Sequence, residues 1–169
     1  MYKTVDTKRN NIFSLTRKGW WQPCYTLTNG AENFGRMCYK GISRRTAIVK
    51  TATDEWHFYT PVLFSRNIII TDANGVEVGR ASRIWFSRRI SLSLQTGFHA
   101  EFNIPSIFSR KYVWTADGCG RIMEINSTFF GWEDSVTVNN NLAPQTVIPL
   151  LIFLGKYLSI LRRRRRAAH

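Results

Sequence analysis

Hydrophobic and polar residues alternate along most of the chain with the period of two that is typical of a half-buried β-strand. In residues 90–94, isoleucine and leucine alternate with serine, and residues 98–104 repeat the pattern with phenylalanine, alanine and isoleucine. Prolines fall between such runs, where they do not interrupt the hydrogen bonds of a strand. The pattern predicts β-structure throughout residues 24–138.

One segment near the C-terminus departs from this alternation. Residues 148–161, IPLLIFLGKYLSIL, would be apolar on nearly every face of a helix, with Lys156 as the single charge. Such a helix must be enclosed by lipid or by protein. At about 1.5 Å per residue it would be about 21 Å long, which is short of the roughly 30 Å of a bilayer core. We therefore predict a helix over residues 148–161 buried inside the protein, with a membrane tail anchor as the alternative.

A sequence unit occurs three times along the chain, at spacings of 43 and 44 residues. Each unit consists of a hydrophobic strand, a threonine, an Asn/Asp–Gly turn and a returning strand introduced by Gly-Arg. The threonines are Thr28, Thr71 and Thr115. Three copies are too few for an ordinary propeller and favour a single closed sheet.

If this sheet closes into a barrel, the C-terminal segment can lie inside it. A barrel of about twelve strands leaves a lumen that side chains alone do not fill, and an apolar helix would fill it. The predicted fold is therefore mainly β: a closed antiparallel β-barrel of about twelve strands around a central hydrophobic C-terminal α-helix. We expect an N-terminal extension at residues 1–19, a barrel domain at 20–161 that includes the helix, and a basic tail at 162–169.

The chain is strongly basic, with 24 lysines and arginines against 11 acidic residues and a formal charge of +13. Part of this charge is a run of arginines, Arg162–Arg166, immediately after the predicted helix. The balance favours anionic partners, either acidic lipid headgroups or nucleic acid, although basic surfaces also occur without a partner. Hydrophobic residues make up 44% of the sequence, which is typical of a globular domain and excludes an intrinsically disordered protein.

The three cysteines, Cys24, Cys38 and Cys119, show neither a metal-binding spacing nor a disulfide framework. The first ten residues lack the apolar core of a secretory signal peptide. We therefore expect reduced thiols in the cytoplasm, a sequon at Asn126 that is not glycosylated, and neither a metal nor a cofactor.

Paired arginines are the candidate anion-binding residues, because guanidinium groups bind phosphate in a bidentate manner. Two such pairs lie one repeat apart, so they are expected in equivalent connections that converge on one face. Solvated connections and a solubilising helix cap are the alternative interpretations. The candidate site consists of Arg44, Arg45, Arg88, Arg89, Arg162, Arg163, Arg164, Arg165 and Arg166. Further candidates are Lys50, Arg66 and Arg110.

Catalytic patterns are missing from the sequence. The three histidines have no metal-binding spacing, and no serine lies in a G-x-S-x-G motif. The adjacent acids Asp54-Glu55 and Glu133-Asp134 would point to opposite faces of a strand, so we expect them to pair with lysines or arginines. The sequence predicts no enzyme activity.

The segment IIITDANGVEVGRASRIWFSRRISLSL (residues 68–94) resembles the tubby C-terminal-like superfamily in its order of strand, D-x-x-G turn, strand, basic residues and strand. This superfamily includes tubby proteins, plant LURP-one-related proteins and phospholipid scramblases. The resemblance extends more loosely through KYVWTADGCGRIMEI to the terminal helix, over residues 20–162. It implies a barrel closed around a hydrophobic helix and, from tubby domains, binding of phosphoinositide headgroups by basic surface residues.

The chain departs from this superfamily in ways that narrow the implied function. It has no acidic calcium loop of the form D-x-[DN]-x-[DN]-G and no palmitoylation-type cysteine cluster, so lipid scrambling is not expected. The headgroup-binding residues of tubby have no position-by-position match here.

Together these features predict a non-enzymatic, tubby-like intracellular module that binds anionic phospholipid or phosphoinositide headgroups at a membrane surface. We expect a cytoplasmic monomer that is peripheral at the membrane. The alternatives are a basic β-domain that binds nucleic acid and a tail-anchored membrane protein. Trp20-Trp21 are expected to pack over the core or a barrel end rather than to contact a membrane interface.

Overall fold

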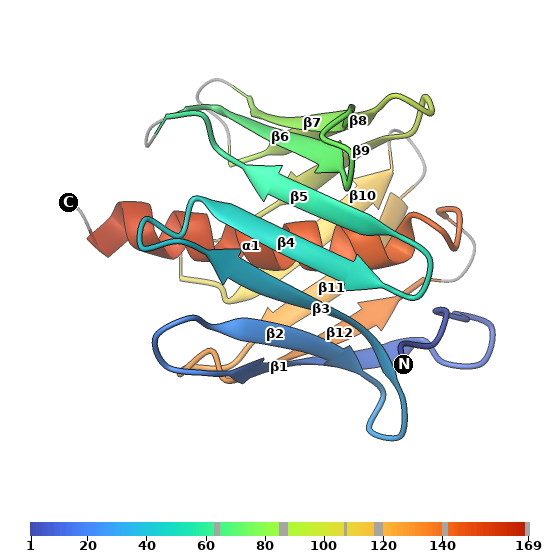
Figure 1. Cartoon of the computed structure of the whole chain (residues 1–169). Coiled ribbons are helices and arrows are strands. Elements are labelled where there is room, and N and C mark those ends of the chain that lie inside the picture. The colour runs from blue at the N-terminus through green and yellow to red at the C-terminus, as the bar shows by residue number, and fades with distance from the viewer. Residues whose placement is uncertain (63–64, 85–87, 107, 117–119, 140–141, 168–169) are drawn as a thin grey trace.

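The strands close into one antiparallel barrel, in which each strand pairs with its sequence neighbours and β1 pairs with β12 (Figure 1). The computed structural model describes residues 1–62, 65–84, 88–106, 108–116, 120–139 and 142–167. The predicted closed barrel around a C-terminal helix is confirmed. The strands are β1 (Ile12–Lys18), β2 (Cys24–Thr28), β3 (Asn33–Lys40), β4 (Thr46–Thr51), β5 (Glu55–Tyr59), β6 (Asn67–Asp72), β7 (Glu77–Arg83), β8 (Ile90–Leu94), β9 (His99–Asn103), β10 (Lys111–Ala116), β11 (Gly120–Ser127) and β12 (Glu133–Val138).

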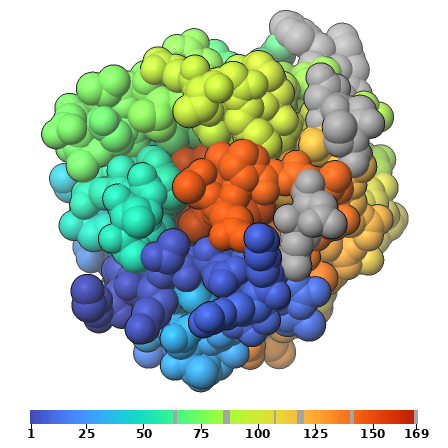
Figure 2. Space-filling model, turned by 90° about the vertical axis from the view of Figure 1, so that its right-hand side faces the viewer, coloured from blue at the N-terminus to red at the C-terminus, as the bar shows by residue number. Residues whose placement is uncertain are grey.

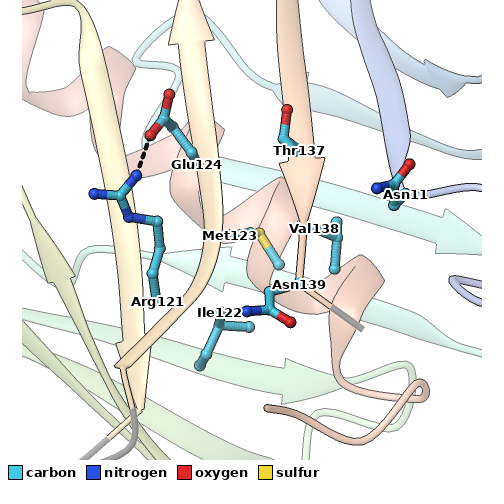
Figure 3. Close-up of a pocket in the computed structure, with 8 residues that line it drawn as sticks. All are labelled: Asn11, Arg121, Ile122, Met123, Glu124, Thr137, Val138 and Asn139. Atoms are coloured by element: carbon cyan, nitrogen blue, oxygen red, sulfur yellow. Dashed lines mark hydrogen bonds and ion pairs between the residues drawn. The ribbon is translucent and has the colours of Figure 1, made fainter. Parts of the chain in front are cut away.

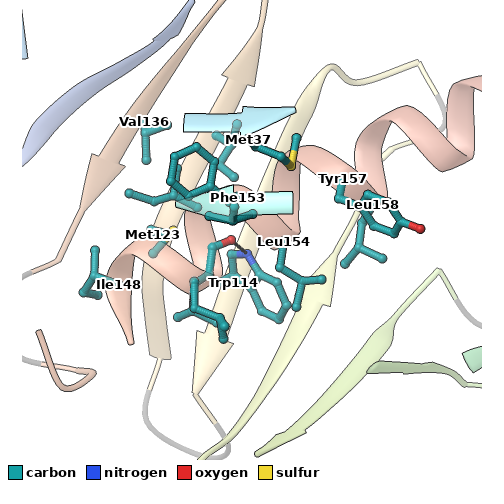
Figure 4. Close-up of a cluster of buried hydrophobic side chains, with 14 of the residues drawn as sticks. Met37, Trp114, Met123, Val136, Ile148, Phe153, Leu154, Tyr157 and Leu158 are labelled. Carbon is teal, nitrogen blue, oxygen red and sulfur yellow. Dashed lines mark hydrogen bonds between the residues drawn. The ribbon is translucent and has the colours of Figure 1, made fainter. Parts of the chain in front are cut away.

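The helix α1 (Ile148–Ala167) runs through the lumen of the barrel (Figure 1). Residues 148–159 of this helix are all buried, and Phe153 lies among side chains of the surrounding wall (Figure 4). The indole N–H of Trp114 on β10 donates to the carbonyl of Leu151 at 2.9 Å. The apolar helix is therefore enclosed by protein, as predicted. No helix in the described part of the chain has both the length and the apolar character needed to cross a membrane.

One charged pair lies inside this apolar core. The Lys156 ammonium on α1 donates to Asp134 on β12 at 2.5 Å, and both side chains are at most 1% exposed. The ammonium also lies 4.6 Å from the ring centroid of Tyr25. Burial lowers the pKa of Lys156, and the Asp134 carboxylate opposes that shift. The expectation that Asp134 pairs with a cation is confirmed.

The helix is longer than predicted, because it continues from residue 161 through the arginine run to Ala167. Arginine is a good helix former, and positive charge is favoured in the last turn of a helix. Most of the predicted basic tail is therefore helix. Residues 168–169 lie outside the described part of the chain.

The barrel also begins earlier than predicted. Strand β1 lies in the segment expected to be an N-terminal extension, yet it pairs with both β2 and β12. Phe13 and Leu15 point into the core and Ser14 lies between them, so the strand has the same alternation as the others. Without β1, strands β2 and β12 would each present an unpaired edge.

The three sequence units correspond to equivalent hairpins of the barrel. In β2–β3, β6–β7 and β10–β11 the pairing register shifts at the residue step that ends in Thr28, Thr71 and Thr115, respectively. An extra residue at the same place in each hairpin increases the local twist, which helps a sheet to close. The turn Asp117-Gly118 of the third unit, and Cys119 beside it, lie outside the described residues.

The prediction of reduced thiols is wrong for two of the cysteines. Cys24 on β2 and Cys38 on β3 form a disulfide. They lie directly opposite each other on neighbouring antiparallel strands, with 4.2 Å between their Cα atoms. The sequence spacing did not indicate this pairing, because the partners are brought together by the register of the hairpin.

The barrel has two different ends. The odd-numbered strands finish at one end, where the C-terminus of α1 emerges; we call it the basic end. The even-numbered strands finish at the other, the turn end, where α1 begins (Figure 1). Figure 2 views the turn end, where the start of the helix (orange) fills the centre above the N-terminal residues (blue).

Candidate functional site

The basic end brings together the arginines that the sequence singled out. Arg44 and Arg45 lie in the β3–β4 connection, Arg88 and Arg89 lie in the β7–β8 connection, and Arg162–Arg166 form the end of α1. Odd-numbered strands all point the same way in an antiparallel barrel, so connections 44 residues apart emerge at one end. The two pairs therefore lie at the same end of the barrel, and of their four arginines Arg88 lines the pocket described next.

A pocket of about 610 Å³ opens at this end, between the last turns of α1 and the wall formed by β6 to β9. Its arginines are half-buried or exposed, whereas Ile68, Ile104 and Leu158 are at most 9% exposed. The pocket therefore presents guanidinium groups above an aliphatic floor. Its lining residues are Arg66, Ile68, Arg83, Arg88, Ile90, Ile104, Leu158, Leu161, Arg162, Arg165 and Arg166.

The positively charged guanidinium groups of this pocket repel one another. Burial lowers the pKa of Arg162, and the neighbouring charge of Arg166 adds to the effect. Burial likewise lowers the pKa of Arg165, followed by the charge of Arg83. Arginine nevertheless stays charged in proteins, and no carboxylate lines the pocket within the described residues. An anion in the pocket would relieve this repulsion.

Arg165 is the most constrained of these arginines. Its Nη2 donates to the carbonyl of Ser65 at 2.8 Å, which holds the guanidinium against the β5–β6 connection. Its Nε is buried and has no hydrogen-bond partner among the described residues. Buried donors of this kind are costly to leave unpaired. Arg165 therefore lines the pocket with a guanidinium whose position is fixed by Ser65.

The arginines on the other side of the helix have a structural role. Arg164 Nη1 donates to the carbonyl of Arg44 at 2.7 Å, and Arg44 Nη2 donates to the carbonyl of Trp21 at 2.8 Å. The Arg164 guanidinium also lies 5.0 Å from the ring centroid of Tyr39. The hydroxyl of Tyr157 donates to the carbonyl of Arg45. These contacts fix the end of α1 to the β3–β4 connection.

The other predicted residues separate into different environments. Arg88 lines the pocket, whereas Arg89 forms an ion pair with Glu101 at 3.6 Å. Arg110 lies at the basic end, with its guanidinium 4.2 Å from the ring centroid of Phe129. Lys50 does not join the cluster, because it lies toward the turn end of β4 and pairs with Glu55 at 3.0 Å.

Sequence reasoning missed Arg83 and the aliphatic floor of the pocket. Arg83 ends β7, and Lys40 ends β3 one repeat earlier, so the repeat spacing was a signal that could have identified it. Of the two expected positions for Trp20-Trp21, the core is wrong, because they are 72% and 84% exposed, whereas their connection does lie at a barrel end. The ring of Trp20 lies beside that of Trp132, with 6.3 Å between their centroids.

A second pocket, of about 460 Å³, lies on the outer wall formed by β11 and β12 (Figure 3). Its charged groups neutralise each other, because Arg121 and Glu124 form an ion pair at 2.7 Å. Lys111 also pairs with Glu124, at 2.9 Å. Arg121 and Glu124 are the charged residues that line the wall pocket, so its lining has no net charge.

Groups suited to metal binding are not gathered anywhere in the described part of the chain. No three or more His, Cys, Asp or Glu residues lie close enough there to hold a metal ion. His57 contacts Glu55 at 3.1 Å, and hydrogen bonds from His57 and Lys50 lower the pKa of Glu55. The expected pairing of Glu55 with a cation is confirmed. His169 lies outside the described residues.

Comparisons with known proteins do not identify the chain further. A scan against protein-family models, a search of curated proteins and a search of solved structures each found no match. The resemblance to the tubby C-terminal-like superfamily therefore stays a prediction. The class of protein that the structure itself defines is a closed antiparallel β-barrel with a central C-terminal helix.

Proposed function

We propose that this protein is a non-enzymatic binding module whose basic end holds anionic phospholipid headgroups, phosphoinositides included, at a membrane surface. The supporting observation is the pocket at the basic end, which combines six arginines with an aliphatic floor. Guanidinium groups bind phosphate through paired hydrogen bonds, and aliphatic side chains suit the glycerol and first acyl carbons below it. A tubby-like ancestry would agree with this function and is part of the proposal.

Nucleic acid is the competing ligand, because it also carries phosphate. The aliphatic floor favours lipid, since Ile68, Ile104 and Leu158 offer neither a stacking surface for a base nor a donor for its edge. The proposal therefore predicts that vesicles compete successfully with RNA and duplex DNA for the protein.

Location at the periphery of a membrane is part of this proposal. The Cys24–Cys38 disulfide favours an oxidising compartment over the predicted cytoplasm, because disulfides persist mainly in oxidising compartments.

Sedimentation with vesicles tests the proposal. Wild-type protein is expected to bind vesicles that contain phosphatidylserine or a phosphoinositide, not phosphatidylcholine alone, and binding should weaken with salt. Each arginine near an anionic surface contributes about 1 kcal/mol. The variant Arg162→Gln/Arg166→Gln should therefore bind about 30-fold more weakly.

The matched control is Arg36→Gln/Arg121→Gln, which removes the same charge from the outer wall of the barrel. It should keep nearly wild-type affinity. Equal losses in the two variants would show that binding depends on net charge alone and would refute a site. Tighter binding to RNA or DNA than to anionic vesicles would instead favour the nucleic-acid alternative.

A further inference from the structure

Every connection at the basic end carries at least one exposed large hydrophobic side chain. These connections follow β1, β3, β5, β7, β9 and β11 and surround the end of α1. We call their exposed hydrophobic residues the apolar ring. The apolar ring consists of Trp20, Trp21, Ile42, Val62, Ile84, Phe108, Phe129, Phe130 and Trp132.

The exposure of the apolar ring is high and confined to one end. Ile42 and Phe108 are 103% and 89% exposed. The other exposed large hydrophobic residues of the described chain are Met1, Ile12 and Val76, which do not lie in these connections. Single exposed hydrophobic residues are ordinary on soluble proteins, but a group gathered on one face marks a contact surface.

Arginine and aromatic side chains are held at the same level around this ring. Arg110 lies 4.2 Å from the ring centroid of Phe129, and Arg17 lies 5.3 Å from that of Trp132. In the described residues, the acidic groups at or beside this end are Glu133, Glu101, which pairs with Arg89, and Asp134, which pairs inside the core with Lys156. The surface of the basic end therefore combines the exposed hydrophobic side chains of the apolar ring with arginines that lie between them.

Among possible partners, an anionic bilayer surface matches this arrangement best. Tryptophan is favoured at the interface of a bilayer, and arginine is attracted to its acidic headgroups. A single-stranded nucleic acid would use the aromatic side chains for stacking, but it gives no role to Ile42, Val62 or Ile84. These aliphatic residues gain free energy only where water is excluded.

We propose that the barrel docks end-on, with the apolar ring inserted into the interfacial layer of an anionic membrane and the arginines at the level of the headgroups. The axis of α1 then points toward the membrane, and the turn end faces away from it. This inference rests on the proposed headgroup binding and adds its geometry and a second source of affinity. Hydrophobic insertion resists salt, whereas headgroup attraction does not.

The test compares two double variants on vesicles of phosphatidylcholine and phosphatidylserine, at low salt and at high salt. Trp21→Ser/Phe130→Ser removes two members of the apolar ring, which should weaken high-salt binding about 100-fold, since burying a large hydrophobic side chain contributes about tenfold or more. The matched control, Ile12→Ser/Val76→Ser, removes exposed hydrophobic residues elsewhere and should bind like wild type. All substituted residues are exposed, and equal melting temperatures would verify that folding is intact.

A second measurement reports directly whether the tryptophan side chains of the apolar ring insert into the bilayer. Brominated phosphatidylcholine quenches tryptophans that enter the bilayer, so wild-type fluorescence should fall on binding through Trp20, Trp21 and Trp132, which are exposed, and not through the buried Trp114. Wild-type binding with no quenching and with equal affinities of both variants would overturn end-on insertion while leaving headgroup binding intact. No wild-type binding even at low salt would instead refute the proposed function. Loss of RNA binding in the ring variant, with vesicle binding unchanged, would assign the ring to nucleic acid.

Discussion

The two ends of the barrel are formed by connections between the same strands, yet they differ in length, charge and polarity. At the turn end, the hairpins close with polar turns: the Asn29 carboxamide oxygen accepts from two backbone N–H groups, and the Asp72 carboxylate does the same. At the basic end, the connections are longer, carry exposed hydrophobic residues and surround the arginines of α1.

The difference agrees with the proposal that one end of the barrel serves stability and the other serves binding. Polar turns whose side chains bond their own backbone are fully satisfied and offer little to a partner. The basic end instead has half-buried guanidinium groups beside exposed aromatic side chains. Neither feature stabilises the folded state, because partial burial of a charge costs free energy and an exposed aromatic side chain gains none from burial. Rigid barrel strands position these groups, and this is the usual division between a scaffold and the loops that carry function.

The largest expected effect concerns the Lys156–Asp134 pair, which keeps the Asp134 carboxylate buried and neutralised. Lys156→Met leaves the Asp134 carboxylate buried and unpaired, so the free energy of unfolding should fall by about 3 to 5 kcal/mol. Urea unfolding at neutral pH measures this change.

The double variant Asp134→Leu/Lys156→Met provides the control for this pair. Because it removes both charges, it should recover most of the lost stability. If Lys156→Met alone is as stable as wild type, the pair is not buried in solution and the basic end contains one more accessible carboxylate than we infer.

The next effect concerns the disulfide that braces the connection bearing Trp20 and Trp21. Cys24 directly follows this connection, and the disulfide closes a loop with a sequence separation of 14 residues. Cross-linking a loop of this size stabilises a protein by about 3 kcal/mol. The variant Cys24→Ser/Cys38→Ser should therefore unfold at lower urea than oxidised wild type. Wild type in dithiothreitol should match the variant, and a variant as stable as oxidised wild type would contradict the bond.

The smallest expected effect tests whether charge alone distinguishes the two ends. Glu32→Arg/Asp54→Arg makes the turn end more basic by four charges without adding hydrophobic tips or a pocket. Affinity for vesicles that contain phosphatidylserine should rise by less than about threefold, because scattered surface charges are well screened at physiological salt. If the added charges raise the affinity as much as the loss of the basic-end arginines lowers it, the architecture of the basic end is unimportant for binding.

The fold was largely predictable because its signals are local. Alternation in strands, Asn/Asp–Gly turns and the all-apolar segment 148–161 each reflect contacts between near neighbours in sequence or the burial of a whole segment. The two errors at the barrel limits have the same origin. Strand β1 and the arginine turns of α1 are each polar in part, so burial alone did not identify them, and they are held by pairing with distant segments.

What the sequence determined by itself was the class of fold and the residue types able to bind an anion. Tertiary structure decided which of them act together: the barrel places Arg83, Arg88 and Arg162 around one pocket and turns Arg89 toward Glu101. The register of the β2–β3 hairpin also joined Cys24 to Cys38, and the enclosure of α1 joined Lys156 to Asp134. The physical reason is that distances between residues far apart in sequence depend on strand order and register, which no single segment specifies.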